Sequence, residues 1–165
     1  MLILGLDPGT TRLGFGIIKK EKGCLTLVTA GCIETSAGQP AKKLHQLERQ
    51  LQQLIKKHQP EAIAIEKLFF AKNQKTALAV AEAKGVLMLC AQKTGQPVFY
   101  YTPLQIKQAV VGYGRADKKQ VQQMIKIILK LKAAPRPDDA ADAVATAVCC
   151  AHSENFDALP RPHAS

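Results

Sequence analysis

The chain has 165 residues, 47% of them hydrophobic, which indicates one globular domain with a substantial core and excludes a disordered protein. Its 23 Lys and Arg residues exceed its 13 Asp and Glu residues, and the formal net charge of +10 favours a polyanionic partner, nucleic acid first and an acidic membrane surface second. No apolar run is long enough to cross a bilayer, and the N-terminus lacks the basic region of a signal peptide.

The cysteines indicate a reducing compartment. Their number is odd and none belongs to a C-x-x-C pair, so we expect free thiols in a cytoplasmic protein. They are Cys24, Cys32, Cys90, Cys149 and Cys150. The four histidines show neither H-E-x-x-H nor zinc-finger spacing, and we therefore expect no zinc site.

The first predicted strand ends in an acid. Residues 2–6 form a near-continuous apolar run, which is typical of a strand buried on both faces. Asp7 follows, and Pro8 and Gly9 then end the strand, because proline lacks an N–H and glycine permits a sharp turn. Ligand sites of open α/β sheets lie at such carboxyl ends, but Asp-Pro-Gly is also ordinary turn chemistry, so Asp7 alone leaves both interpretations open.

Two further strands and a crossover follow this turn. Residues 13–20 and 24–34 are separated by a short Lys-Glu-Lys-Gly turn, which predicts antiparallel neighbours of the first strand. One apolar face predicts a helix over 41–58, with a solvated basic outer face. The strand predicted over 61–66 is entered from this helix, so we expect it to lie parallel to the first strand, with Glu66 at the edge where Asp7 lies.

The second half of the chain is mainly helical. Thr102 and Asp117 are suitable N-caps for two of its helices. The predicted elements are a helix over 76–94, a strand over 98–101, a helix over 103–111, a helix whose apolar side runs from Val121 to Leu131, and a helix over 138–152. The polar tail over 153–165 is expected to fray.

The last predicted helix carries three acids near its start. Asp139 and Asp142 are three residues apart, Asp138 and Asp142 are four apart, and either pair would share a helix face, so spacing leaves the choice open. Asp138 and Asp139 could simply cap the helix. Asp142 differs, because it is flanked by alanines and a valine on a helix apolar enough to be buried, where an unpaired carboxylate is costly.

Together, the acids at the two strand ends and on the last helix predict a metal site. Bare carboxylates at one edge of a basic protein would repel one another and a nucleic-acid backbone. Mg²⁺ takes oxygen ligands and binds phosphate oxygens at the same time. Two such ions about 4 Å apart activate water on one side of a phosphodiester and stabilise the departing oxygen on the other. The sequence therefore predicts metal-dependent phosphodiester hydrolysis.

Four stretches carry a family resemblance that runs from Ile3 to about His152. They are Leu4-Gly5-Leu6-Asp7-Pro8-Gly9; Ala64-Ile65-Glu66 followed by Phe69-Phe70-Ala71-Lys72-Asn73; Gln105-Ile106-Lys107-Gln108 with Val110-Val111-Gly112; and Asp139-Ala140-Ala141-Asp142-Ala143. In this order and at this spacing they resemble the RuvC-type Holliday junction resolvases, bacterial endonucleases of the ribonuclease-H-like superfamily.

The resemblance implies an α/β, ribonuclease H-like fold, with a mixed five-stranded sheet flanked by helices in one nuclease domain over residues 1–152. It implies a homodimer that nicks two strands of like polarity in a four-way DNA junction, leaving 5′-phosphate and 3′-hydroxyl ends, in recombination and repair. The RuvA–RuvB branch-migration complex is the implied partner. The implied cofactor is Mg²⁺, with two ions per active site, for which Mn²⁺ can substitute.

The resemblance also assigns site residues. The family's metal-binding catalytic carboxylates match Asp7, Glu66, Asp139 and Asp142. This match selects Asp139 over Asp138, which we then expect to act as a cap. Lys107 and Lys118 match family lysines near the scissile phosphate, where a fixed cation would stabilise developing charge. Without the family, Lys118 would be an ordinary first-turn residue after its cap.

Further DNA contacts are expected in two loops. Phe69 matches a family residue at the DNA, where it would stack on unpaired bases, although either neighbouring phenylalanine ring could instead close the core. The other expected contacts are Lys72, Asn73, Arg115 and Lys119. The alanine-rich helix over 76–94 is either plain core or the two-fold contact of the dimer.

Three alternatives remain beside a junction resolvase. Asp7-Pro8-Gly9-Thr10-Thr11 also resembles the phosphate loop of sugar kinases, but 165 residues leave no room for their second lobe. A non-catalytic DNA-binding module would suit the charge, yet it leaves the acids unexplained. A superfamily relative that acts on another branched or RNA-containing substrate is disfavoured only by the family match.

Overall fold

The computed structural model describes residues 1–9, 12–36, 38–67 and 74–153. In this part of the chain, five strands form one mixed sheet in the order β3-β2-β1-β4-β5. The strands are β1 (Leu2–Pro8), β2 (Arg12–Glu21), β3 (Cys24–Glu34), β4 (Ala62–Glu66) and β5 (Val98–Tyr101). The helices are α1 (Pro40–His58), α2 (Gln74–Lys93), α3 (Pro103–Val111), α4 (Lys118–Ile128) and α5 (Asp138–Ala151).

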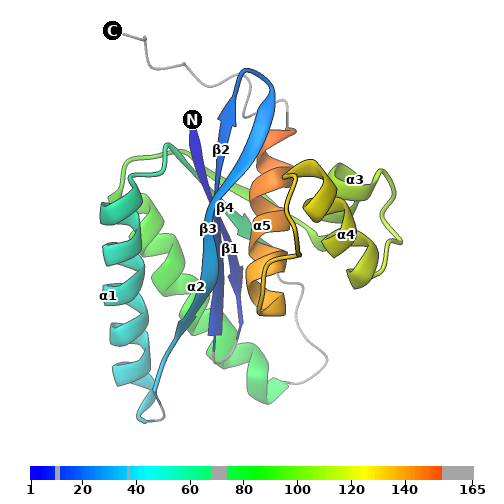
Figure 1. Ribbon diagram of the computed structural model, residues 1–165. Helices are drawn as coiled ribbons and strands as arrows, with labels where there is room; N and C mark the ends of the chain where they lie inside the picture. The colour runs from blue at the N-terminus through cyan, green and yellow to red at the C-terminus, as the bar shows by residue number, and fades with distance from the viewer. Residues whose placement is uncertain (10–11, 37, 68–73, 154–165) are drawn as a thin grey trace, which may run out of the picture.

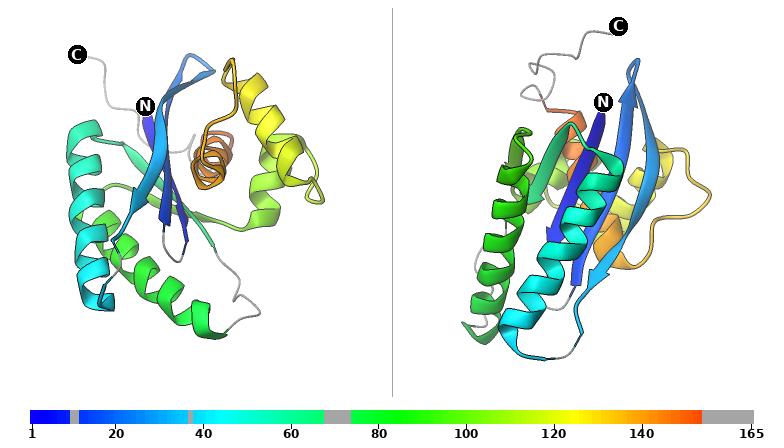
Figure 2. Two further views of the ribbon diagram at one scale, coloured as in Figure 1. Left: turned by 60° about the horizontal axis from the view of Figure 1, so that its bottom comes forward. Right: turned by 90° about the vertical axis from the view of Figure 1, so that its left-hand side faces the viewer.

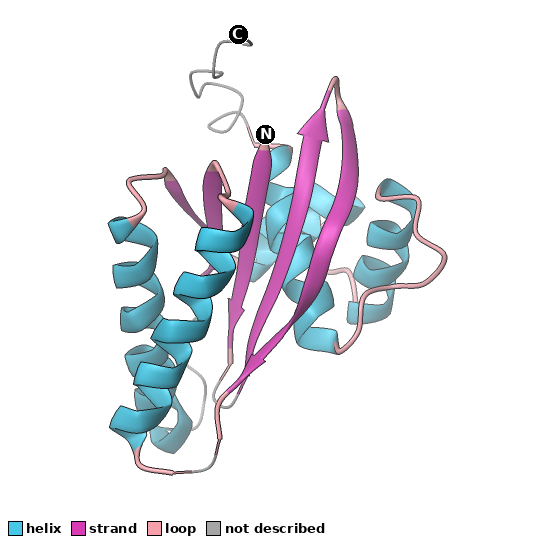
Figure 3. Cartoon of the chain, turned by 60° about the vertical axis from the view of Figure 1, so that its left-hand side comes forward, coloured by secondary structure: helices cyan, strands magenta, loops and turns pink. Residues whose placement is uncertain are grey.

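The sheet has the predicted directions. β2 pairs antiparallel with both β1 and β3, whereas β4 pairs parallel with β1 and β5. The long antiparallel strands β2 and β3 therefore extend one side of the sheet, and the helix crossovers build the other (Figure 3). β1 is the central strand, and its side chains are buried on both faces of the sheet, Ile3 on one and Leu4 and Leu6 on the other, which explains its continuous apolar run.

Helices cover both faces of the sheet. α1 and α2 lie on one face and α5 on the other, with α3 and α4 stacked outside α5 (Figures 1 and 2). The apolar core is divided in the same way, because alternate residues of a strand point to opposite faces. Ile63 and Ile65 of β4 pack with Leu51 of α1, whereas Ala62 and Ala64 pack with α5.

Helix α5 lies directly on the backbone of the sheet. Gly5 of β1 and Gly14 and Gly16 of β2 face it, and a Cβ atom at any of them would collide with α5. The collisions would be with the backbone of Ala143 for Gly5, the backbone of Asp139 for Gly14, and both a side-chain methyl and the backbone of Val144 for Gly16. A Cβ is the smallest side chain that these positions could add, so glycine is what permits this approach. The approach carries the acids near the start of α5 to the end of β1.

The capping predictions are partly confirmed. Thr102 and Asp117 both form capping boxes with a glutamine three residues later, Gln105 and Gln120 respectively. In each box the cap side chain accepts a hydrogen bond from the glutamine backbone N–H, and the glutamine side chain accepts one from the backbone N–H of the cap residue. The cap predicted at Asp138 is wrong. Pro137 is the N-cap residue of α5, no side chain caps this helix, and the Asp138 carboxylate points away to other partners. Within the described residues, no helix is both long and apolar enough to cross a membrane.

Candidate active site

The ends of β1 and β4 bring two carboxylates together. Leu6 pairs with Ile65 in parallel register, so the next residue of each strand, Asp7 and Glu66, stands at the same edge. Burial, and then the negative charges of Glu66, Asp142 and Asp139, raise the pKa of Asp7 far above its usual range. Burial and the charge of Asp142 also raise the pKa of Glu66, against the opposing charges of Lys107 and Lys118.

Helix α5 supplies the remaining acids. Asp142 is half-buried beside the strand ends, with 30% of its side chain exposed. Burial raises its pKa, and the contact with Lys118 offsets only part of that effect. One turn further on, the Thr146 hydroxyl donates to the Asp142 backbone carbonyl at 3.0 Å, within the helix. Asp139 lies close enough for its charge to add to the repulsion that Asp7 and Asp142 experience.

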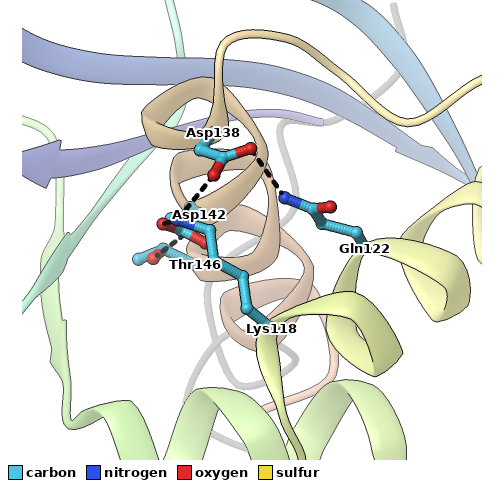
Figure 4. A network of polar contacts seen from close by, with 5 residues as sticks. All are labelled: Lys118, Gln122, Asp138, Asp142 and Thr146. Atoms are coloured by element: carbon cyan, nitrogen blue, oxygen red, sulfur yellow. Dashed lines mark hydrogen bonds and ion pairs between the residues drawn. The ribbon is translucent and has the colours of Figure 1, made fainter.

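Lys118 connects α4 to this cluster (Figure 4). Its Nζ lies 2.9 Å from Oδ2 of Asp142 and 3.3 Å from Oδ2 of Asp138. On the far side of Asp138, Gln122 Nε2 donates to Oδ1 at 3.0 Å. Partial burial disfavours the ammonium, but its contacts with Asp142 and Asp138 outweigh burial and raise the pKa of Lys118. The Gln122 hydrogen bond and Lys118 together lower the pKa of Asp138.

These residues surround a cleft of about 330 Å³. Its polar lining consists of Asp7, Glu66, Asp142, Lys107 and Lys118. Its apolar walls are Pro103, Ile106, Val121 and Ala145. Such a cleft is large enough for ions and a phosphate group, and both acids and lysines line it. Another cavity, between α1, α2 and the β2–β3 edge, has a largely apolar lining and no convergent carboxylates.

The donor set suits hard divalent cations. Asp7, Glu66, Asp139 and Asp142 offer only carboxylate oxygens, the ligands that Mg²⁺ prefers. Burial, and then repulsion between the carboxylates, raises the pKa values of Asp7 and Glu66, and a bound cation would remove the repulsive part of this cost. Within the described residues, no group of three or more acidic, histidine or cysteine side chains is already placed to hold a metal ion. The positive charge that Asp142 contacts in this structure is Lys118.

The structure brings together most of the site residues predicted from the sequence. Asp7, Glu66, Asp142, Lys107 and Lys118 line one cleft, with Asp139 nearby. Two of the expected DNA contacts, Arg115 and Lys119, are exposed in the loop before α4 and in its first turn. The other three, Phe69, Lys72 and Asn73, lie outside the described residues.

Sequence reasoning missed the contact that Gln122 makes with Asp138. A weak signal existed, because Gln122 follows Lys118 by four residues and so shares its helix face. Spacing within α4 could not show that this face meets the first turn of α5, since that depends on the packing of two helices far apart in the sequence.

Comparison with known proteins identifies the family. Residues 3–150 match the family model of Crossover junction endodeoxyribonuclease RuvC. A relative of that name from Alkaliphilus metalliredigens is 52% identical over 160 residues, which cover 96% of this chain and 98% of the relative. Another from Pelotomaculum thermopropionicum is 53% identical over 158 residues, which cover 95% of this chain and 96% of the relative.

A solved structure agrees. Thermus thermophilus RuvC in complex with a Holliday junction substrate superimposes with a TM-score of 0.83 at 34% identity, covering 92% of this chain and 94% of that chain. The predicted ribonuclease H-like α/β fold with a mixed five-stranded sheet is confirmed. The chain belongs to the RuvC family of crossover junction endodeoxyribonucleases.

Proposed function

We propose that this chain is a structure-selective endonuclease that resolves four-way (Holliday) DNA junctions, in recombination and repair, by paired nicks in strands of like polarity. The observation that carries this proposal is the cleft in which Asp7, Glu66 and Asp142 face Lys107 and Lys118. It combines an oxygen-rich cation site with fixed positive charge, in a chain of net charge +10 that belongs to a family of junction endonucleases.

The cleavage step is metal-dependent hydrolysis. Asp7, Glu66, Asp139 and Asp142 would hold two divalent cations, with Mg²⁺ the first choice and Mn²⁺ a substitute. When bound, such ions would supply an activated water and stabilise the departing oxygen of the phosphodiester. The acids themselves are carried by regular elements, β1, β4 and α5, which fix where each carboxylate starts. Departure of the 3′ oxygen leaves 5′-phosphate and 3′-hydroxyl ends.

The two lysines of the cleft act on the phosphate. Lys107 of α3 is half-buried in the cleft wall, and Lys118 begins α4. An ammonium held in the same cleft as the carboxylates stabilises negative charge that develops on the phosphoryl oxygens. Both helices pack on α5, so the backbone positions that carry the two lysines are fixed relative to α5.

The outer rim of the cleft binds the DNA backbone. Arg115 and Lys119 are exposed beside Lys118, where they suit phosphate contacts that set the position of the duplex without reading its sequence. Phe69, Lys72 and Asn73 are proposed as further contacts on the basis of the family resemblance, with Phe69 stacking on unpaired bases near the junction centre.

The active unit is a homodimer that joins through α2. Leu78, Met88 and Leu89 are large apolar side chains exposed on this helix, with Leu78 67% and Leu89 53% accessible. A Cβ at Gly85, on the same side, would meet nothing within 4 Å in the single chain. A second copy packed there would bury this surface and give two equivalent active sites for two equivalent strands.

Two wider assignments rest on the family and on the thiols. The RuvA–RuvB branch-migration complex is the proposed partner that delivers the junction. All five cysteines are free thiols in the structure, which supports a cytoplasmic location.

The test is cleavage of a synthetic four-way junction with Mg²⁺ or with EDTA, scored for paired nicks. We expect symmetric nicking with Mg²⁺ and none with EDTA. Parallel reactions on linear duplex, a replication fork and an RNA–DNA hybrid separate the alternative, a nuclease for another branched or RNA-containing substrate. Faster cleavage of any of these than of the four-way junction would favour that alternative.

A further inference from the structure

Two carboxylates share Lys118, and their surroundings differ. Asp142 faces the cleft and is 30% exposed, whereas Asp138 lies at the rim and is 66% exposed. Both contact the same ammonium through Oδ2, at 2.9 Å for Asp142 and 3.3 Å for Asp138. Lys118 therefore already has two acceptors, one inside the cation-binding cluster and one outside it (Figure 4).

Asp142 faces competition that Asp138 does not. A divalent cation held by the cluster would use the carboxylate that Lys118 now contacts through Oδ2, and two positive charges at one oxygen repel each other strongly. A cation bound at Oδ2 would therefore move the ammonium off Asp142. A long, flexible lysine with no second acceptor would then turn into solvent, away from the position where it acts on the phosphate.

The contacts of Asp138 orient its carboxylate so that it can retain that ammonium. Gln122 Nε2 donates to its Oδ1 at 3.0 Å, which fixes the orientation of the carboxylate and leaves Oδ2 facing Lys118. Gln122 and Lys118 lie one turn apart on α4, so the same helix face presents both groups to the first turn of α5. Asp138 takes no part in capping α5, so its contacts on α4 account for its orientation.

We propose that Asp138 and Gln122 are positioning residues, which hold Lys118 at the mouth of the cleft once a divalent cation occupies Asp142. This inference rests on the proposed function for the role of Lys118, but the exchange of partners is a property of the cation site alone. Asp138 acts through Lys118 and not on the substrate.

The test compares Asp138→Asn in two backgrounds, wild type and Lys118→Ala. At saturating Mg²⁺ and junction, we expect Asp138→Asn to lower kcat about twofold to fivefold, as the loss of one exposed ion pair allows. Junction affinity, measured in EDTA, should stay unchanged. Asp138→Glu should recover most of the rate. In the Lys118→Ala background, Asp138→Asn should have no further effect, because the group that it positions is gone.

A second readout needs neither DNA nor turnover. Mn²⁺ alone is titrated into the protein by calorimetry. Asp138→Asn should weaken Mn²⁺ binding, since Lys118 then has only Asp142 as acceptor and competes more strongly for it. This loss should vanish in the Lys118→Ala background. If wild type fails to cut any junction, the proposed function falls, while this titration still decides the positioning role.

The matched controls are Gln123→Leu for Gln122→Leu, and Glu21→Gln for Asp138→Asn. Gln123 is the exposed neighbour on α4, and Glu21 is an exposed acid that pairs with Lys19 at the end of β2. Gln122→Leu should reproduce the Asp138→Asn effect in weaker form, and neither control should. An equal loss from Asp138→Asn in both backgrounds, in rate or in Mn²⁺ affinity, would overturn the proposal, as would an unchanged kcat in wild type.

Discussion

Leu6 and Ile65 stand side by side in parallel strands, and each is followed by an acid. This single pairing brings Asp7 and Glu66 to one edge of the sheet although 58 residues separate them in the chain. A shift of the register by one residue would turn one of the two acids toward the opposite face of the sheet. Backbone pairing thus fixes the part of the candidate site that the sheet supplies.

Replacing Asp7 tests the acid cluster directly. We expect Asp7→Asn to reduce the rate of junction cleavage in Mg²⁺ by at least about 100-fold, because an amide cannot supply the charge that holds a cation there. Junction affinity in EDTA should not fall, and removal of a negative charge should raise it slightly. Undiminished cleavage would remove Asp7 from the mechanism.

The pKa shifts predict how stability depends on pH. Because the pKa values of Asp7, Glu66 and Asp142 are raised in the folded protein, it retains protons that the unfolded chain releases from about pH 4 upward. The stabilisation from this cluster is therefore complete below about pH 4 and is lost as pH rises through the raised pKa values, about 8 for Asp7. We expect the midpoint of thermal unfolding of the metal-free protein to show this loss.

Two comparisons isolate that effect from other titrations. Without metal and at about pH 7.5, Asp7→Asn should melt at a higher temperature than wild type, and the difference should shrink toward pH 4. Addition of Mg²⁺ should raise the midpoint of wild type more than that of Asp7→Asn. A variant that melts below wild type at neutral pH without metal would contradict the raised pKa of Asp7.

Substitutions at Lys118 and Lys119 should distinguish an effect on the cleavage rate from an effect on DNA affinity. We expect Lys118→Ala to lower the cleavage rate of bound junction roughly 10-fold to 1,000-fold, with little change in affinity, because its charge acts at the reacting phosphate. Lys119→Ala, the adjacent and exposed residue, should instead weaken binding and reduce the dependence of log Kd on log salt by about 1. A large loss of affinity in Lys118→Ala with normal chemistry would reassign it to backbone binding.

The dimer proposal is tested on α2. Leu89→Glu, or the same change at Leu78, should yield a monomer in sedimentation at micromolar concentration, because a buried charge opposes packing of two copies. The monomer should remain folded, since both side chains are exposed in the single chain. Ile127→Glu, on α4 and 67% exposed, is the matched control and should stay dimeric. A wild-type protein that sediments only as a monomer would refute the interface.

The contact between α5 and the sheet gives a stability prediction. Gly16→Ala should destabilise the fold by about 1–3 kcal/mol, measured by urea unfolding, because its Cβ would collide with Val144 on α5. Adding Val144→Ala should recover little, since the new Cβ would also lie 2.8 Å from the Val144 backbone nitrogen. Full recovery in the double variant would show that side-chain packing, and not backbone approach, sets this contact.

Local chemistry explains which parts of the fold could be predicted. The strand over 98–101 and the helix over 103–111 have the predicted bounds, because Thr102 and Pro103 fix the start of the helix through short-range bonds. The crossover that brings Glu66 beside Asp7 followed from the handedness and direction of a strand entered from a helix. These features depend on neighbours in the sequence or on general rules of topology.

Tertiary packing explains what could not be predicted. A cap at Asp138 was a sound local expectation, but Gln122 and Lys118 lie within reach and orient its carboxylate toward α4. The same packing decides that Lys118 meets Asp142, which no spacing within α4 or α5 reveals. The choice of Asp139 over Asp138 comes from the family match alone and stays a prediction, while Asp138 contacts Lys118 and Gln122 of α4.

The glycines beneath α5 make the distance between the acids of β1 and α5 independent of the apolar core on the other face of the sheet. At Gly5 and Gly14 the strands and α5 approach main chain to main chain, so no side chain sets their separation at these two points. Substitutions at Leu51 or Leu87, which pack on the opposite face of the sheet, can lower the melting temperature while the distance between Asp7 and Asp142 stays the same. Evolutionary drift in that half of the interior is thereby uncoupled from the chemistry of the cleft.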